Sequence, residues 1–392
     1  METQIRLLRS FGFSTVFAAV PGSYTMGTTP ASWDDFNHNS GELGADEVIT
    51  SSFPALGYWR ELREITKSWI LKRNAVHWSL APAHFAIPSS RLIEILRKDD
   101  VALILANHVY TLPFAMKLRD AARADGKSIR VAVVTHDVQS HILLDRQAST
   151  PWSSSAPHEP ALLRTELEWL EQADSLIHNS YQDHVFFSER LPSMPHHLMY
   201  PCMPKSGTPC PDQVLSRDLL FVGNNHSGNV ASLKWYFDAV LPHFGSFPPR
   251  LTAIGNICEA IPALTNSLKD TSWLELIHEV DDLGPYYGSA RAALGSTTSG
   301  RGISVKVIEA FAAGLPVVGT RMAFRGIPEG SLTKAGMIWA DSARAFADLV
   351  RRAMQSELRD ELRKAGDALY DEMFAPHLAA DAFRKVIDQL QR

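Results

Sequence analysis

Residues 298–320 decide the fold, and they read Thr298-Ser-Gly-Arg-Gly-Ile-Ser-Val-Lys-Val-Ile-Glu-Ala-Phe-Ala-Ala-Gly-Leu-Pro-Val-Val-Gly-Thr320. The pattern predicts the end of a buried strand, a glycine loop, a helix that begins near Ser304 and another buried strand. Gly314 stands where that helix has to end. The order strand, glycine loop, helix, strand is typical of an α/β domain with a parallel sheet.

The residues of this stretch suit a phosphate-bearing ligand. Gly300 and Gly302 allow a ligand to approach the backbone closely. Ser304 is suited to cap the helix, whose unpaired N–H groups and positive dipole end favour an anion. Lys306 follows in the first turn, where a bound anion would offset the unfavourable interaction of a cation with the dipole. Glu309, about one turn further, is placed to reach neutral hydroxyls of the same ligand.

A second interpretation of the same residues is a glycine turn before an ordinary core helix. Val305, Ile308, Phe311 and Leu315 are apolar at helical spacing, which favours a helix packed on a core. A single Gly-x-Gly pattern does not separate the two interpretations. Local physics therefore leaves nucleotide binding and simple packing open.

Further strands and helices alternate outward from this stretch. Short apolar runs bounded by Gly, Pro or Asn predict buried parallel strands, separated by helices with apolar spacing of three or four. A sheet covered on both faces, as in a Rossmann-like domain, follows from this alternation. The strands predicted in the C-terminal half are Leu219–Val222, Leu251–Ile254, Leu274–Ile277, Ala292–Leu294, Pro316–Val318 and Met337–Trp339. Those predicted in the N-terminal half are Ala102–Ala106, Ile129–Val134 and Ser175–Asn179, with a long loop over residues 22–57.

The chain has the length of two domains rather than one, because 392 residues exceed an ordinary single core. A proline-dense run after Tyr200 predicts a linker between two similar α/β halves. Two such halves place a ligand in the cleft between them. The predicted parts are an N-terminal Rossmann-like domain 1–200, a linker 201–216, a C-terminal Rossmann-like domain 217–372, and a final helical segment 373–392 that packs back on the first domain.

Composition excludes several classes of protein. The net charge of −5 gives no electrostatic footprint for nucleic acid, so no nucleic-acid partner is expected. Three cysteines without a Cys-x-x-Cys pair favour a reducing compartment over a disulfide scaffold. No apolar run approaches the roughly 20 residues of a membrane span. The expected location is the cytoplasm.

The chain resembles glycosyltransferase family 4 and its close GT-B relatives. In that family a glycine-rich turn precedes a Lys-x-x-Glu-Ala helix and an Ala-Gly-x-Pro-Val-Val strand, as in residues 298–320. Four other segments resemble family stretches in the same order along the chain: Val131–Ser140, Ala173–Ser180, Leu220–Phe237 and Val280–Tyr287. The resemblance implies a GT-B fold, with two Rossmann-like domains facing a central cleft. It also implies that domain 1–200 would bind the acceptor and that domain 217–372 would bind the nucleotide sugar.

The resemblance also implies roles for residues of the loop and helix. Glu309 would hydrogen-bond the ribose of the nucleotide, and Lys306 would contact the diphosphate. Ser304 and Val305 would present backbone N–H groups to the same diphosphate, with Gly302 allowing its close approach.

On the other side of the donor, Gly223 would allow close approach, with Asn224 and Asn225 near the sugar or the phosphates. His136 matches a family histidine that faces the donor sugar from the N-terminal domain. Arg301 stands where many members carry a sugar-contacting Glu. It would add charge to the phosphate site or select an acidic sugar, or it is a solvent-facing loop arginine.

The start of the chain also departs from the family pattern. Residues 1–18 resemble the family's first helix and second strand, and the usual opening strand with its glycine loop has no counterpart in this sequence.

The function implied is a retaining glycosyltransferase that moves a sugar from a nucleotide-diphosphate donor to a glycan or lipid-linked acceptor. Positive groups aimed at the leaving diphosphate would lower the barrier without a metal, and no cofactor besides the nucleotide sugar is expected. Lys306, Arg301 and His136 are the candidate catalytic residues. Two alternatives remain open: a GT-B sugar-nucleotide epimerase, and a catalytically silent GT-B binding subunit.

Two weaker signals concern the N-terminal half. Residues 58–73 predict an amphipathic helix with basic flanks, which either packs on the core or lies on the inner face of a membrane. His108 follows a predicted strand and is either an acceptor contact or a buried or loop histidine. His196 and His197 stand near prolines and are predicted to lie in a loop rather than to bind a metal.

Overall fold

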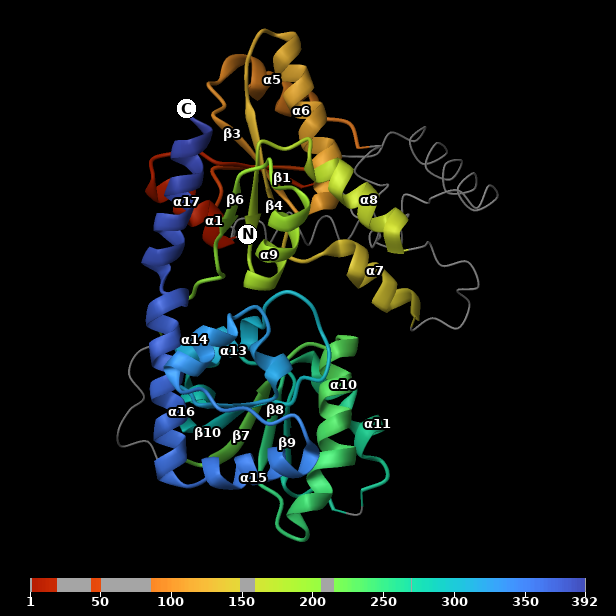
Figure 1. Ribbon diagram of the computed structural model, residues 1–392, viewed down its shortest axis with the longest axis vertical. Coiled ribbons are helices and arrows are strands. Elements are labelled where there is room, and N and C mark those ends of the chain that lie inside the picture. Colours follow the sequence, from red (N-terminus) through yellow and green to blue (C-terminus); the bar gives the residue numbers. More distant parts are fainter. Residues whose placement is uncertain are drawn as a thin grey trace. The chain divides into compact units, whose positions relative to one another are not determined.

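The computed structural model divides the chain into two compact units (Figure 1). The N-terminal unit contains Met1–Asn179, Asp183–Met199 and Ala380–Arg392, and the C-terminal unit contains Ser180–Gln182 and Tyr200–Ala379. The structure describes residues 2–19, 44–50, 86–148, 159–205, 215–268 and 270–391. The predicted amphipathic helix 58–73 and most of the predicted linker 201–216 lie outside these residues.

The C-terminal unit contains one five-stranded sheet in the order β11-β10-β7-β8-β9, and every pairing is parallel. Five of the six strands predicted for this half are present, but Met337–Trp339 is not a strand. Its Trp339 forms a single bridge with Gly319. The strands are β7 (Arg217–Val222), β8 (Leu251–Ile254), β9 (Leu274–Ile277), β10 (Ala290–Gly295) and β11 (Val317–Gly319).

Helices cover both faces of this sheet, with α10 on one side and α16 on the other (Figure 1). The core between the layers is formed by fully buried aromatic and aliphatic side chains, such as Phe221, Phe237 and Phe311. The helices are α10 (Ser227–Trp235), which continues through a π turn at Tyr236–Val240, α11 (Ile261–Thr265), α12 (Gly284–Ser289), α13 (Val305–Ala312), α14 (Glu329–Ala335), α15 (Ala343–Ala353) and α16 (Ser356–Leu369).

The strand order reverses direction at β7. The chain runs from β7 through β8 to β9 on one side, and then returns to place β10 and β11 on the other side of β7. Right-handed crossovers in opposite directions put the connecting helices on opposite faces. The connections that follow β7 and β10 therefore turn to opposite faces of the sheet. The region between these connections, at the carboxyl ends of the two strands, forms the crevice that is the usual ligand position in an open α/β sheet.

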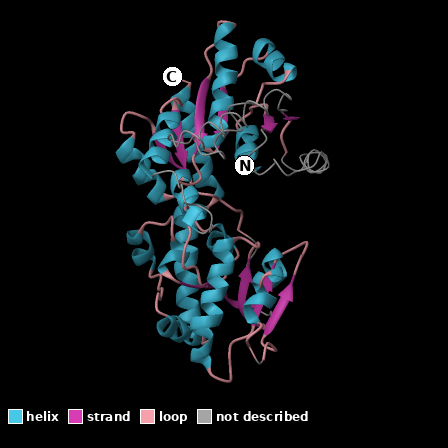
Figure 2. Cartoon of the chain, turned by 90° about the vertical axis from the view of Figure 1, so that its right-hand side faces the viewer, coloured by secondary structure: helices cyan, strands magenta, loops and turns pink. Residues whose placement is uncertain are grey.

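The N-terminal unit has a four-stranded parallel sheet in the order β3-β4-β5-β6 and a separate parallel pair β1-β2. Figure 2 shows the strands and the helices of this unit from a second direction. The strands are β1 (Val16–Ala19), β2 (Glu47–Thr50), β3 (Leu103–Asn107), β4 (Arg130–Val134), β5 (Ser175–His178) and β6 (His196–Leu198). The helices are α1 (Glu2–Ser10), α5 (Ser90–Lys98), α6 (Leu112–Ala124), α7 (Gln139–Ala148), α8 (Glu159–Leu170) and α9 (Tyr181–Arg190).

Two sequence predictions for this unit are wrong. His196 and His197 belong to strand β6 and not to a loop, because they pair with Leu176 and Ile177 of β5. Residues 47–50, inside the predicted loop 22–57, form strand β2 and pair with β1. The rest of that predicted loop, apart from residues 44–46, lies outside the described residues.

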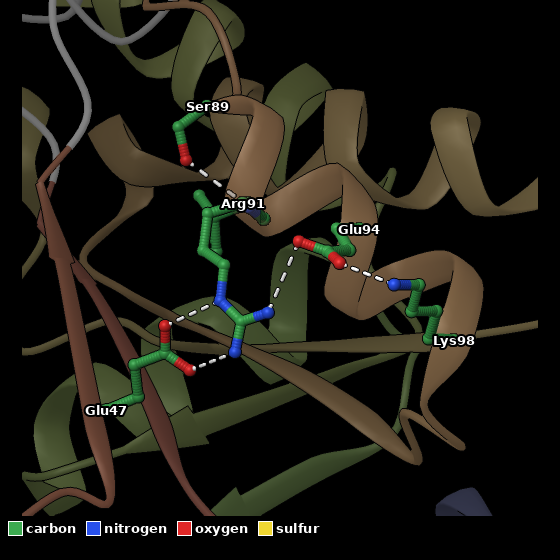
Figure 3. A network of polar contacts seen from close by, with 6 residues as sticks. Glu47, Ser89, Arg91, Glu94 and Lys98 are labelled. Atoms are coloured by element: carbon green, nitrogen blue, oxygen red, sulfur yellow. Dashed lines mark hydrogen bonds and ion pairs between the residues drawn. The ribbon is translucent and has the colours of Figure 1, made fainter.

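Strand β2 is tied to helix α5 by a chain of charged contacts (Figure 3). Both carboxylate oxygens of Glu47 accept from Arg91, at 2.8 and 2.9 Å. Arg91 also donates to Glu94, which receives a second bond from Lys98. The Ser89 side chain caps α5 by accepting from the Leu92 N–H. A bidentate arginine pair fixes orientation, so this contact sets the position of the small sheet against α5.

The end of the chain returns to the N-terminal unit. Helix α17 (Pro376–Leu390) contributes Phe383, which is fully buried and lies 6.4 Å from Phe11 between ring centroids. The guanidinium of Arg384 stacks over the Phe11 ring, 4.5 Å from its centroid. No helix in the described parts of the chain is both long and apolar enough to cross a membrane.

Candidate functional site

The amino end of α13 lies at the crevice of the C-terminal unit. Ser304 is the residue that precedes the helix, in an extended conformation, but its side chain makes no capping hydrogen bond. Its hydroxyl is buried and has no partner among the described residues, so the expected capping role is not seen. Val305 is 41% exposed, so the first turn of the helix is not sealed under packed side chains.

The glycine loop before α13 has conformations that favour glycine. Gly300 has φ +145° and Gly302 has φ +62°. A Cβ at Gly300 would lie 3.0 Å from Nε of Arg325, which donates to the carbonyl of Arg301. Glycine at position 300 thus leaves room for the Arg325 side chain, which holds the loop through the Arg301 carbonyl. The Arg301 side chain itself is exposed.

Lys306 is a half-buried cation held from two sides. Its ammonium donates to Oδ1 of Asn229 at 2.7 Å and lies 4.5 Å from the centroid of the Phe221 ring. Burial, with a smaller contribution from the nearby Arg325 and an opposing one from Glu309, lowers the pKa of Lys306 to about 8. The group therefore remains mostly protonated at neutral pH and is poorly solvated, which strengthens its attraction for an anion.

Glu309 lies one turn along the same helix. The hydroxyl of Tyr287 donates to its Oε2 at 3.3 Å. Burial raises the pKa of Glu309, and the contacts with Tyr287 and Lys306 partly reverse that rise. Burial and the adjacent Glu309 raise the pKa of Tyr287, so Tyr287 remains a hydrogen-bond donor at neutral pH. One carboxylate oxygen thus has a fixed partner, which sets the orientation of the carboxylate.

The turn after β7 faces this helix across the crevice. Gly223 continues the sheet through a bond from its N–H to the Ile254 carbonyl. A Cβ at Gly223 would lie 3.0 Å from the Phe221 ring and 3.1 Å from Nδ2 of Asn229. The close approach that Gly223 permits is therefore with the protein's own side chains. A Cβ at Gly255 would lie 2.4 Å from the Gly223 carbonyl, so glycine is needed there too.

The two asparagines that follow Gly223 are exposed. Asn224 accepts two bonds from Nδ2 of Asn229, one at its backbone oxygen and one at its side-chain oxygen. Asn225 donates to Glu259 at 3.4 Å. These contacts order the turn and leave its outer surface accessible.

A small pocket lies between β7, β10 and α13. Most of its lining side chains are apolar, and those of Lys306 and Tyr287 are polar. Its lining residues are Leu220, Val222, Tyr287, Ala293, Leu294, Gly295, Lys306, Val307 and Val317.

The N-terminal unit has its own group of polar residues at strand ends, centred on His136. Its Nε2 contacts Oδ1 of Asn107 at the end of β3, and its Nδ1 contacts Nδ2 of Asn179 after β5, at 3.1 Å. His108 stacks on His136 with centroids 4.1 Å apart, and on Tyr110 at 4.7 Å. His108 and His136 are the non-glycine residues with positive φ in the described parts of the chain, at 80° and 55°.

These contacts fix the protonation of His136. An amide oxygen accepts and an amide nitrogen donates, so His136 carries its hydrogen on Nε2 and receives at Nδ1. Burial, with a smaller contribution from His108, lowers the pKa of His136 to about 3. Burial likewise lowers the pKa of His108 to about 4. Both rings are neutral at physiological pH. Backbone strain of this kind typically occurs at functional positions.

The structure brings nine of the ten predicted site residues together in the C-terminal unit: Gly223, Asn224, Asn225, Arg301, Gly302, Ser304, Val305, Lys306 and Glu309. His136 lies in the N-terminal unit. Sequence reasoning missed Asn229, Tyr287 and Arg325. Asn229 and Tyr287 lie inside segments that the resemblance had singled out, whereas nothing in the local sequence marks Arg325. No cluster of three or more metal-ligating side chains occurs among the residues that the structure describes.

Comparisons with known proteins bear on the family and the fold. Residues 216–356 match the family described as glycosyl transferases group 1. Solved structures with the same fold include a glycosyltransferase from Rickettsia africae, with 12% identity and a TM-score of 0.65, covering 100% of this chain and 93% of that one. HepE from Anabaena, solved with UDP and glucose, has 12% identity and a TM-score of 0.64, with coverages of 99% and 95%.

A third structure, TarM from S. aureus, was solved with fondaparinux, alpha-GlcNAc-glycerol and UDP. It has 11% identity and a TM-score of 0.56 over 79% of this chain, which spans only 59% of TarM. No curated protein matches the chain.

The fold that the chain shares with these structures is that of the GT-B class. The match to the group 1 glycosyl transferases covers residues 216–356 of this chain. The GT-B fold expected from the sequence is confirmed, as is the resemblance on which that expectation was based.

Proposed function

We propose that the chain is a retaining, metal-independent transferase that moves a sugar from a nucleoside-diphosphate donor to a glycan or lipid-linked acceptor. The observation that carries the proposal is the amino end of α13, which is accessible at the crevice and has Lys306 and Glu309 on successive turns. An unpaired helix end and a buried cation suit a diphosphate, and a carboxylate one turn away suits a ribose.

Each side chain of the crevice has a part in this proposal. The backbone N–H groups of Ser304 and Val305 would bind the diphosphate together with the Lys306 ammonium, and Gly302 allows the phosphates near the loop. Glu309, oriented by Tyr287, would accept from the ribose hydroxyls.

The turn after β7 would close the other side of the donor. Asn224 and Asn225 are exposed there and would contact the phosphates or the sugar. Arg301, on the loop braced by Arg325, would add positive charge on the side of the transferred sugar.

The reaction requires stabilisation of the leaving group. As the bond to the sugar breaks, negative charge grows on the diphosphate oxygens. Lys306 and the amino end of α13 are charges and dipoles fixed in place before that step, and such preorganised groups lower the barrier without rearranging. The metal-independent form of the mechanism rests on these groups.

His136 would act on the sugar as a neutral hydrogen-bonding group. Its low pKa makes proton transfer to or from the ring unfavourable at neutral pH, which argues for a polar contact rather than general acid catalysis. A sugar hydroxyl would replace one of the two asparagine amides at the ring. Because both ring nitrogens of His136 are already hydrogen-bonded, this exchange preserves the number of hydrogen bonds at the ring.

The similar structures solved with UDP make UDP the first nucleotide to test. Binding of UDP, GDP and ADP is measured by calorimetry, and transfer is measured with the corresponding sugar nucleotides. Glu309→Ala and Lys306→Ala are expected to weaken binding and to reduce transfer at least about 100-fold with the fold intact. The exposed Lys364→Ala serves as the matched control. Normal binding and transfer in both site variants would refute the proposal.

The same assays separate the alternatives. Conversion of the sugar nucleotide to an isomer in the absence of acceptor would identify an epimerase. Tight nucleotide binding with no turnover of any sugar nucleotide would identify a silent binding subunit. Transfer that survives EDTA supports the metal-independent mechanism, and a product with inverted anomeric configuration would overturn the retaining one.

A further inference from the structure

We infer that Asn229 is a positioning residue that sets the Lys306 ammonium for the donor diphosphate. The inference rests on the proposed function, because it assigns a purpose to a contact within that site. Asn229 lies in the first half of α10, the helix that follows the turn after β7. It is 77 residues from Lys306 in sequence.

The hydrogen bonds of Asn229 determine which way its amide faces. An ammonium only donates, so the atom facing Lys306 at 2.7 Å is Oδ1. The amide nitrogen then donates to the two oxygens of Asn224, at 3.0 and 2.9 Å. Both polar atoms of this side chain form hydrogen bonds, so the orientation of the amide is fixed. The fixed amide oxygen in turn holds the Lys306 ammonium in one position.

Two further features hold the ammonium in one place. The Phe221 ring, only 1% exposed, lies under it at 4.5 Å and attracts the cation through its face. Gly223 leaves the space that the Asn229 amide occupies, since a Cβ would lie 3.1 Å from Nδ2. The position of the Asn229 amide thus explains why a glycine, Gly223, follows β7.

A neutral amide suits this task better than a carboxylate. A carboxylate at position 229 would form an ion pair with Lys306 and reduce its attraction for a diphosphate. The amide orients the ammonium while leaving its full charge. The other ionisable groups around Lys306 are Arg325, Glu309 and Tyr287, and Glu309 is already engaged by Tyr287.

The first experiment compares UDP with uridine. If UDP binds weakly, the tightest of GDP and ADP is used with its nucleoside. Asn229→Leu is expected to weaken the diphosphate about 10-fold at pH 7, measured by calorimetry. Affinity for the nucleoside, followed by ligand-observed NMR, should remain within twofold because it does not contact Lys306. The exposed Asn266→Leu on the same unit is the matched control and should change neither.

The second experiment measures a pH profile with Asn229→Asp. The introduced carboxylate favours the charged form of Lys306, so the pH at which diphosphate affinity declines should move upward by about one unit relative to the wild type. A side chain with only a structural role would leave that pH unchanged.

The outcomes separate the two proposals. If Lys306→Ala does not weaken the diphosphate, the proposed site fails. If Lys306→Ala weakens it but Asn229→Leu does not, the positioning role alone is overturned. Equal loss of diphosphate and nucleoside binding in Asn229→Leu, or an unshifted profile in Asn229→Asp, would also overturn it, since either result indicates a general disturbance of the unit. Circular dichroism of each variant checks the fold.

Discussion

Both units have polar residues at the carboxyl ends of parallel strands, but the central residue is charged at neutral pH in one unit and uncharged in the other. In the C-terminal unit, Lys306 has an amide oxygen at 2.7 Å and a carboxylate nearby, and its pKa of about 8 leaves it mostly charged at pH 7. In the N-terminal unit, His136 lies between two amides and a second imidazole, and its pKa of about 3 leaves it neutral.

Burial is the first cause of the pKa shift at both positions, so the difference has another origin. An ordinary lysine titrates far above neutrality and tolerates a drop of more than two units, whereas histidine starts close to neutrality. The same physical environment thus yields a cation from one residue type and a neutral ring from the other. In the proposed function, the cation would bind a diphosphate and the neutral ring would form a hydrogen bond with an uncharged sugar.

The largest expected effect comes from removing the charge on one side of this comparison. Lys306→Met retains most of the side-chain volume but loses the cation, so the leaving diphosphate loses a preorganised partner. Transfer is expected to fall about 10²–10³-fold in kcat. Stability should not fall, because an apolar side chain avoids the cost of burying an ammonium. Steady-state kinetics and thermal unfolding test the two parts, and lower stability with normal kcat would contradict both.

A buried carboxylate in the N-terminal unit gives the next largest effect. Glu166, only 1% exposed, accepts the N–H groups of Gln139 and Ser140 at the start of α7, each at 2.8 Å. Glu166→Ala leaves both donors without this partner and is expected to lower the free energy of unfolding by about 2 kcal/mol. The exposed Glu168→Ala on the same helix is the control. Equal urea midpoints for the two variants would show that the cap contributes nothing.

A smaller effect concerns the pH dependence of donor binding. Lys306 must be protonated to attract the diphosphate, and its pKa in the free protein is about 8. Affinity should therefore be constant below pH 7 and fall as pH rises through 8, reaching about a tenfold loss near pH 9. Calorimetry across pH 6.5–9.5 measures the curve, and Lys306→Met should abolish this decline. A decline that persists in Lys306→Met would assign it to another group.

The smallest expected effect concerns a buried, neutral histidine of the N-terminal unit. His178 is fully buried, receives from the Thr135 hydroxyl and donates to Nδ1 of His196, which in turn donates to the Leu191 carbonyl. Burial lowers the pKa of His178 to about 2, so below pH 6.5 the unfolded chain takes up a proton that the folded chain does not. Stability is fully present above pH 6.5 and should fall by about 1 kcal/mol at pH 5.5.

Urea unfolding at pH 7.5 and 5.5 measures this loss in the wild type and in His178→Gln. Because His108, His136 and other buried histidines add similar contributions, the relevant quantity is the difference between the two proteins. His377→Gln, at an exposed position, should behave as the wild type. An unchanged acid sensitivity in His178→Gln would remove His178 from the explanation.

The strands of the C-terminal unit could be predicted because each is a short apolar run with a clear boundary. The prediction failed at Met337–Trp339, which has the same composition but forms only one bridge with Gly319. It also failed at β2, whose four residues give a weak periodic signal and depend on pairing with β1 and on the Arg91 contact with Glu47. Strand identity at a sheet margin is decided by neighbours rather than by local pattern.

The sequence by itself determined the α/β class, the two halves and the glycine loop before α13, because hydrophobic period and glycine position are local properties. Only the tertiary structure decided that Asn229 holds Lys306, that Tyr287 orients Glu309 and that two asparagines fix the hydrogen of His136. These contacts join residues between 22 and 77 positions apart. No local pattern encodes such a pairing, because it arises when strands adjacent in space bring distant segments to the same edge of a sheet.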